Sequence, residues 1–260
     1  MAFAPPSAAA GQVVRAKVPF MIEVRDFHKA FADHVAVRGV TFRVEPGELL
    51  GIIGPNGAGK TTTMRAIAGI IPASRGRLSV AGFAVDEDPI AAKSRLAFVP
   101  DEPPLFPDLT VEEHVRFYAN VYRVADARAT ADRLIEEFEL SSKMRTPASN
   151  LSRGMRQKLA ICCAYLHDPQ AILFDEPLTG LDPQGIRVLK RSLRERAEQG
   201  AAVMISSHLL AMVEDLCTHV LILAGGTQRF CGPLDELRRR FDTEESVTRL
   251  EEIFFAATCP

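Results

Sequence analysis

The sequence predicts an α/β protein with a mostly parallel sheet, an antiparallel β subdomain near the N-terminus and an inserted helical subdomain. Three observations support this fold class. Apolar runs of strand length alternate with helical sequence, which is typical of a parallel sheet covered on both faces. Two further runs are separated by a polar turn and favour an antiparallel pair. Helical sequence from about 101 to 165 interrupts the strand–helix alternation.

The first part of the chain supplies most of the strands. Residues 1–18 lack the basic start and the apolar segment of a signal peptide, and we expect a disordered tail there. The apolar run at 48–54 is continuous, which suits a buried central strand, and a helix is expected after it at 61–70. The strands expected in this part are at 21–24, 35–44, 48–54, 77–80 and 96–99.

Helices dominate the middle of the chain. The pattern is helical from about 110 to 140, and Thr110 with Glu113 forms the Thr-x-x-Glu pattern of a capping box. A basic helix is expected to start near Gly154 and to end at Tyr165. It opens with Ser152 and with a glycine in its first turn, where glycine costs roughly 1 kcal/mol relative to alanine. The strands expected after this helix are at 171–175, 202–206 and 220–223.

Composition narrows the possible functions. The 260 residues are 47% hydrophobic and 25% charged, as in globular proteins with a sizeable core. A formal net charge of −2 provides no general attraction to nucleic acid or to an anionic membrane. We expect no membrane span, because no apolar run approaches the roughly 18 residues that one requires. The five cysteines are unpatterned and odd in number, which suits a reducing cytosol.

A phosphate-binding loop is the strongest motif in the chain. GPNGAGKTT at 54–62 matches G-x-x-x-x-G-K-[ST] in full, between an apolar strand and a helix, and therefore predicts a P-loop NTPase core. Lys60 is expected to reach the β- and γ-phosphates and Thr61 to bind Mg²⁺. An ordinary glycine-rich turn is the alternative, but it does not require Lys-Thr after the last glycine. The expected nucleotide contacts are Gly54, Pro55, Asn56, Gly57, Ala58, Gly59, Lys60, Thr61 and Thr62.

Two acidic residues complete the predicted nucleotide site. Asp175 and Glu176 follow the apolar strand AILF, and the carboxyl ends of parallel strands are where ligands bind in such sheets. We expect Asp175 to hold the Mg²⁺ shell and Glu176 to orient and polarise the attacking water. A solvated strand end is the alternative interpretation. No N-K-x-D sequence follows to recognise guanine, so adenine is the expected base.

Four further motifs make the chain resemble the nucleotide-binding subunit of ATP-binding cassette (ABC) transporters over nearly its whole length. LSRGM at 151–155 is similar to the family's signature, usually written LSGGQ. TGLDP at 179–183 is similar to its D-loop. MISSHLL ends a strand in the switch histidine, His208. Phe31 falls where the family places an aromatic ring to stack on adenine.

The resemblance implies a head-to-tail homodimer, in which each ATP lies between one subunit's phosphate loop and the other's signature helix. Ser152 and Gly154 would then contact a γ-phosphate bound by the partner, because the start of a helix favours an anion. A simple N-cap is the other interpretation of Ser152. The resemblance also assigns His208 to the γ-phosphate and Asp182 to coupling between the two sites. Its cofactors are ATP and Mg²⁺.

Two positions depart from the family pattern. Asp101 falls where the family has the Q-loop glutamine; it is expected as a further Mg²⁺ residue, although it adds negative charge beside Asp175 and Glu176. Arg153 replaces the first glycine of the signature, and either adds a cation near the phosphate or faces solvent. Both departures, with Met155 in place of glutamine, resemble the branch that works with ABC-2 type permeases, which are mostly exporters.

The resemblance implies an ATPase subunit that docks on a separate integral membrane permease and powers transport. Its ABC-2 branch implies that the direction of transport is export. It places the chain in the cytoplasm, peripheral to the inner face of the cell membrane, with PPLFPDLT at 103–110 as the expected permease contact. The sequence of this subunit does not name the cargo, because the resemblance assigns cargo recognition to the membrane permease. A soluble ABC-type ATPase acting on ribosomes or DNA is the alternative function, and an unrelated kinase is a third. We expect no nucleic-acid partner.

The expected domains are a tail at 1–18, an ABC ATPase domain at 19–242 with a helical subdomain at about 101–165, and an extension at 243–260.

Overall fold

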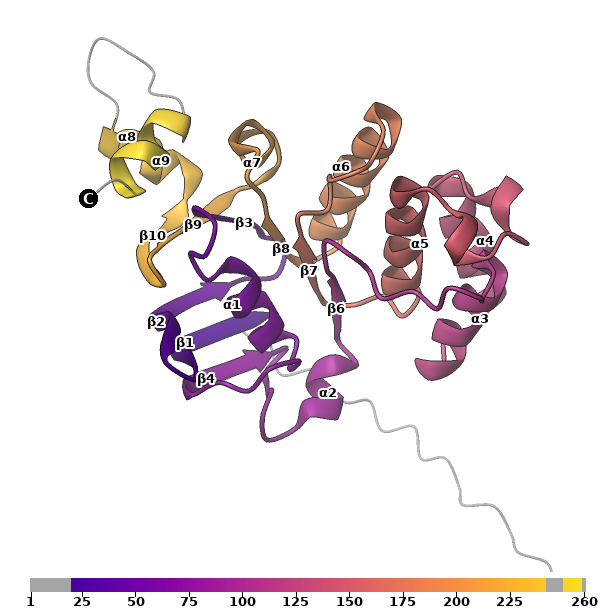
Figure 1. The fold of residues 1–260 in the computed structure, drawn as a ribbon, viewed down its shortest axis with the longest axis horizontal. Helices are drawn as coiled ribbons and strands as arrows, with labels where there is room; N and C mark the ends of the chain where they lie inside the picture. The colour runs from indigo at the N-terminus through magenta and orange to yellow at the C-terminus, as the bar shows by residue number, and fades with distance from the viewer. Residues whose placement is uncertain (1–19, 242–249, 259–260) are drawn as a thin grey trace, which may run out of the picture.

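The computed structural model of this chain describes residues 20–241 and 250–258. The predicted tail at 1–18 lies outside these residues, as does part of the predicted extension at 243–260. Figure 1 shows one sheet that contains β1, β2 and β4, and a second sheet through the middle of the molecule. The helices α3, α4 and α5 form a group beside the second sheet. The α/β fold class, with its antiparallel β subdomain and inserted helices, is confirmed.

Two sheets organise the described part of the chain. The first has the strand order β2-β1-β4-β5 and is antiparallel. The second has the order β10-β9-β3-β8-β7-β6, and its strands are parallel except where β10 pairs with β9. The strands are β1 (Ile22–Phe31), β2 (His34–Val44), β3 (Leu49–Ile53), β4 (Arg75–Val80), β5 (Phe83–Ala84), β6 (Leu96–Val99), β7 (Ala171–Asp175), β8 (Ala202–Ser206), β9 (His219–Ala224) and β10 (Thr227–Pro233).

The predicted helical insertion lies between β6 and β7 and contains α3, α4 and α5. Its first helix begins with the predicted capping box: the Thr110 side chain accepts from the Glu113 N–H, and the Glu113 carboxylate accepts from the Thr110 N–H. The helices of the described residues are α1 (Lys60–Ile67), α2 (Pro89–Lys93), α3 (Val111–Val121), α4 (Ala127–Glu137), α5 (Arg153–Tyr165), α6 (Pro183–Glu198), α7 (Leu210–Leu216), α8 (Leu234–Phe241) and α9 (Leu250–Thr258), with short 3-10 turns at Ser141–Lys143 and Ala148–Asn150.

The larger sheet has a hydrophobic cluster on each face, and the central strand β3 contributes to both. Leu49 and Ile53 belong to the cluster formed with α5, α6 and α7. Leu50 and Ile52 belong to the other cluster, which includes the antiparallel sheet and α1. Neighbouring side chains of a strand point to opposite faces. All five residues of β3 are therefore buried, which explains its continuous apolar sequence.

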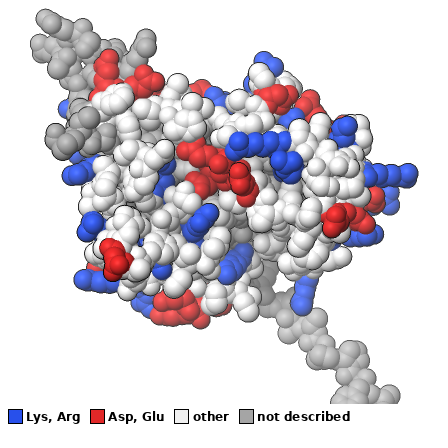
Figure 2. Space-filling model, in the orientation of Figure 1, with Lys and Arg blue, Asp and Glu red and all other residues white. Residues whose placement is uncertain are grey.

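Charge is mixed over the surface. Figure 2 shows acidic and basic side chains interspersed on the face viewed, without one sign covering it. Within residues 20–241 and 250–258, no helix combines the length and the apolar character needed to cross a membrane.

Candidate functional site

The candidate site lies at the carboxyl ends of three neighbouring parallel strands. β3 leads into the phosphate loop at Gly54, β7 ends at Asp175, and β8 ends at Ser206. Asp175 and Ser206 are paired in register across β7 and β8. Because all three strands run in the same direction, the sheet itself brings these groups to one edge.

Glycines allow the phosphate loop to fold tightly against its neighbours. A Cβ on Gly54 would stand 2.3 Å from the Leu223 carbonyl oxygen, so no larger residue fits there. Gly59 has φ = 101°, a left-handed conformation that is costly for residues with side chains. Helix α1 starts at the next residue, Lys60, and no side chain of the described residues caps it. The N–H groups at this helix start remain available, and they form a cradle that suits a phosphate.

Lys60 is buried and held by the loop that precedes it. Its ammonium group donates to the carbonyl oxygens of Gly54, at 2.7 Å, and of Pro55, at 3.2 Å. Burial lowers the pKa of Lys60 below its ordinary value of 10.5, while the negative charges of Glu176 and Asp175 act in the opposite direction. Lys60 is therefore a buried cation next to the phosphate cradle, and the negative charges of Glu176 and Asp175 favour its charged form.

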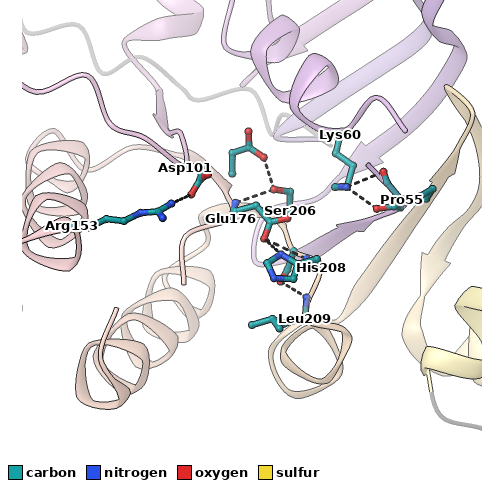
Figure 3. Close-up of polar contacts among 11 residues, drawn as sticks. Pro55, Lys60, Asp101, Arg153, Glu176, Ser206, His208 and Leu209 are labelled. Atoms are coloured by element: carbon teal, nitrogen blue, oxygen red, sulfur yellow. Dashed lines mark hydrogen bonds and ion pairs between the residues drawn. The ribbon is translucent and has the colours of Figure 1, made fainter. Parts of the chain in front are cut away.

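Ser206 organises the acidic pair, as Figure 3 shows. Its hydroxyl donates to Asp175 Oδ1 at 2.5 Å and accepts from the backbone N–H of Glu176 at 3.0 Å. Glu176 has φ = 51°, which is an uncommon conformation for a residue with a side chain and is typical of functional sites. Sequence analysis missed Ser206; the available signal was a polar residue ending an apolar strand beside the strand of Asp175.

His208 contacts Glu176 directly. His208 Nδ1 and Glu176 Oε2 are 2.8 Å apart, and the His208 backbone N–H points to the same oxygen at 3.4 Å. The two residues follow the neighbouring strands β8 and β7. The structure therefore brings the predicted switch histidine to the predicted catalytic glutamate (Figure 3).

One cavity joins the phosphate loop to the acidic pair. It has a volume of about 340 Å³. It is lined by Phe31, His34, Ala36, Asn56, Gly57, Ala58, Gly59, Lys60, Thr61, Thr62, Asp175 and Glu176. Phe31 is 45% exposed, so a large part of its ring is open to a ligand. The lining offers N–H groups, a cation, hydroxyls and carboxylates, and this donor set fits a nucleoside triphosphate.

The same donor set fits Mg²⁺ bound through a nucleotide. In the described part of the chain, no three His, Cys, Asp or Glu residues are grouped closely enough to hold a metal by themselves. Mg²⁺ in proteins is usually bound by one or two protein ligands, together with water and phosphate oxygens. Thr61 and Asp175 both line the cavity and supply oxygens of the kind that Mg²⁺ prefers.

Seven predicted site residues do not line that cavity. Three of them, Gly54, Pro55 and His208, adjoin its lining residues as described above, and the other four are Ser152, Gly154, Asp182 and Asp101. Ser152 caps α5, since its hydroxyl oxygen accepts from the Met155 N–H at 3.2 Å. Gly154 packs against the D-loop: a Cβ there would stand 2.5 Å from the Gly180 carbonyl oxygen. Asp182 caps α6 by accepting from the Gly185 N–H at 3.0 Å, and that bond is the main cause of its lowered pKa. The fourth residue is Asp101.

Asp101 contacts Arg153. Asp101 Oδ1 accepts from the Arg153 guanidinium at 2.9 Å (Figure 3). We expected Arg153 either to lie beside a phosphate or to face solvent. Neither expectation included an ion pair with Asp101. The Mg²⁺ role of Asp101 stays a prediction.

Another cavity, also of about 340 Å³, opens between the sheet and the helical insertion. It is lined by apolar and aromatic side chains, including Phe98, Pro103, Leu105, Tyr118 and Tyr122. Three residues of the stretch predicted to contact a permease, Pro103, Pro104 and Leu105, lie in its wall. Next to them, the exposed rings of Phe106 and Phe117 pack edge to face, 5.2 Å between centroids.

Comparison with known proteins agrees with this geometry. The family model described as ABC transporter matches residues 37–179. The chain is 33% identical over 242 residues to the ABC-type transporter ATP-binding protein EcsA of Bacillus subtilis (strain 168), covering 92% of this chain and 96% of the relative. It is 32% identical to the Nod factor export ATP-binding protein I of Cupriavidus metallidurans, covering 84% of this chain and 72% of the relative.

A solved structure described as the ATP binding subunit of an ABC transporter superposes with a TM-score of 0.85. Its sequence is 34% identical, and the match covers 91% of this chain and 99% of the other. The similarity therefore includes both sheets and the helical insertion that the described residues form.

Proposed function

Since this chain belongs to the ATP-binding subunits of ABC transporters, we propose that it powers export through a separate membrane permease by binding and hydrolysing ATP. The observation that carries this proposal is the cavity in which the phosphate loop, Asp175 and Glu176 meet. The relatives described above are named for transport or export. We therefore do not retain the alternative of a soluble ATPase acting on ribosomes or DNA.

The residues of the cavity divide the work of hydrolysis. The loop N–H groups and Lys60 bind the β- and γ-phosphates, and Phe31 stacks on the adenine. Thr61 and Asp175 would hold Mg²⁺, whose charge would offset that of the phosphates. Glu176 orients and polarises the attacking water, and general-base assistance of this kind contributes about 10²- to 10⁴-fold.

His208 and Ser206 position the groups that do this work. Ser206 holds Asp175 through its hydroxyl and holds the backbone of Glu176 through the same oxygen. His208 bonds the Glu176 carboxylate through Nδ1, so contact with a γ-phosphate falls to its other ring nitrogen, Nε2. The histidine thus links the γ-phosphate to the catalytic carboxylate.

Two copies of the chain would complete the site. In a head-to-tail homodimer, Ser152 and Gly154 at the start of α5 face the γ-phosphate bound by the partner, and Asp182 couples the two sites. The cap bond of Ser152 uses an acceptor lone pair of its oxygen, so its hydroxyl proton can still be donated to a phosphate. Capping and phosphate contact are therefore compatible roles for Ser152.

The apolar cavity beside the helical insertion is the proposed permease contact. Its wall contains Pro103 and Leu105, and the exposed pair of Phe106 and Phe117 extends the apolar surface. Exposed apolar surface of this kind commonly marks an interaction site. Docking there would hold the subunit at the inner face of the cell membrane.

Mixing two defective chains tests the shared site. Both chains carry Glu176→Gln, so that bound ATP is trapped. One also carries Lys60→Ala, which damages its phosphate loop. The other carries Ser152→Asp, which keeps a good N-cap but places a negative charge opposite the partner's γ-phosphate. Random pairing makes half of the dimers mixed with one intact site each, so trapped ATP should reach about a quarter of the parental level.

The outcomes separate shared from separate sites. ATP trapped by the mixture, and by neither variant alone, supports the head-to-tail dimer. Confirmed mixed dimers that trap nothing would show that each chain uses its own Ser152. Ser152→Asn is the matched control, because asparagine also caps a helix but adds no charge, and it should trap more ATP than Ser152→Asp.

A further inference from the structure

Asp101 and Arg153, the two residues that depart from the family pattern, are partners in space. They are 52 positions apart in sequence, yet the guanidinium of Arg153 donates to Asp101 Oδ1 at 2.9 Å. Their side chains are 44% and 49% exposed, respectively. Figure 3 shows Arg153 extending from its helix toward Asp101, on the side away from Lys60.

Arg153 also lies on the D-loop. A Cβ on Gly180 would stand 3.0 Å from Cδ and 3.1 Å from Cγ of Arg153, so the aliphatic stem passes closely over this glycine. The next residue, Gly154, approaches the Gly180 carbonyl oxygen from the same turn of α5. The start of α5 is therefore held by two separate segments of the chain.

The ion pair joins the segment that directly follows the edge strand of the larger sheet to the last helix of the helical insertion. Asp101 comes two residues after the end of β6, which is the edge strand of the larger sheet. Arg153 is the first residue of α5, the helix that starts with Ser152 as its cap. A shift of α5 relative to the end of β6 would therefore lengthen or break this contact.

We propose that Arg153 is a positioning residue, anchored by Asp101 and Gly180, which fixes the start of α5 relative to the sheet that carries the phosphate loop. This inference rests on the head-to-tail dimer proposed above. In a two-fold pair, both shared sites form together only if each subunit holds its own α5 at the matching distance from its own loop. An arrangement that already exists before binding lowers the cost of association.

This role gives Asp101 an alternative to contact with Mg²⁺. Its carboxylate carries the charge that holds the arginine, so a neutral residue at either position should have the same effect. The contribution of an exposed pair is modest, and it is screened by salt. A weak contact of this kind can stabilise one orientation of the helical insertion without preventing its movement.

A double-mutant cycle tests the pair, using Asp101→Asn, Arg153→Gln and the double variant. The first measurement is hydrogen exchange of the Met155 and Arg156 amides, which bond to Ser152 in the first turn of α5. Each single variant should exchange about two- to fivefold faster, the factor expected for an exposed ion pair. The double variant should exchange no faster than either single variant, because the two changes remove one contact.

The second measurement is ATP-driven dimerisation by sedimentation, with Glu176→Gln in every chain. The ATP concentration at half-dimerisation should rise about two- to fivefold in each variant, and Arg153→Lys should recover part of the loss. The difference from the parent should shrink at about 1 M salt. Arg128→Gln is the control, because Arg128 and Asp132 form an exposed pair within α4, and it should change neither measurement.

Additive effects of the two substitutions, or an unchanged dimerisation midpoint, would overturn the proposal. Failure of the Glu176→Gln parent to dimerise with ATP would overturn the shared site and with it the purpose assigned to Arg153. The exchange cycle would still report separately whether Asp101 and Arg153 act as a pair. The two failures are therefore distinguishable.

Discussion

Gly154→Ala offers a direct test of why a glycine stands in the first turn of α5. In an open helix this change would stabilise the protein by about 1 kcal/mol, since alanine is the better helix former. Here the new methyl group would stand 2.5 Å from the Gly180 carbonyl oxygen, which belongs to the backbone and cannot rotate away. Overpacking of this kind costs roughly 1–3 kcal/mol, and so close an approach favours the upper part of that range. We expect a net destabilisation of about 1–2 kcal/mol.

Urea unfolding of the full chain measures this effect, because a changed midpoint at constant slope reports a change in stability. Gly185→Ala is the matched control in the first turn of α6. Its methyl group would meet Lys158 Cε at 2.9 Å and Asp182 Oδ1 at 2.7 Å, which are ends of flexible side chains. Helix preference and loss of the Asp182 cap each amount to about 1 kcal/mol with opposite sign, so the control should be nearly neutral. A Gly154→Ala protein as stable as the parent would refute the reasoning.

Three further predictions concern the site and the fold. Glu176→Gln should preserve ATP binding but slow hydrolysis at least about 10²-fold, and parental turnover would remove the role given to Glu176. Asp101→Asn should leave the Mg²⁺ midpoint of hydrolysis unchanged if Asp101 anchors Arg153, whereas a shifted midpoint would favour metal contact. The hydrogen bond from the Thr110 backbone N–H is the main cause of the lowered pKa of Glu113. The Glu113 carboxylate therefore stabilises the fold at pH values above its ordinary pKa of 4.5. Glu113→Gln should therefore unfold more easily than the parent at neutral pH, and the difference should disappear as acid carries the pH through the lowered pKa.

The buried parallel strands were predictable from sequence because burial on both faces makes them continuously apolar. β3, β7 and β8 are buried along their whole length, and each matches a predicted apolar run. β10 was not predicted. Its sequence TQRFCGP has a single buried position, Phe230, because it pairs antiparallel at the sheet edge and leaves most side chains accessible. An edge strand of this kind depends on its neighbour β9 more than on its own pattern.

The same distinction holds within the site. The loop residues from Gly54 to Thr62 are contiguous, so their spacing alone specifies a cradle, and the apolar strand before them specifies where it lies. Ser206 becomes visible only when the register of β7 and β8 places it opposite Asp175. No local rule sets that register, because it depends on how α6, the helix that connects the two strands, packs against the sheet. Sequence therefore predicts the contiguous half of the site better than the half that the sheet assembles.

Asp101 and Arg153 show the consequence most clearly. Considered separately, each departure looks unfavourable: a carboxylate added near other carboxylates, and a long cation in place of a glycine. Considered together, they hold each other at 2.9 Å, and the arginine stem covers a glycine of the D-loop. The family pattern has a neutral glutamine and a glycine at these positions, which could not form such a contact. Since neither residue has this partner without the other, the two departures are better explained as one feature of the structure than as two independent losses.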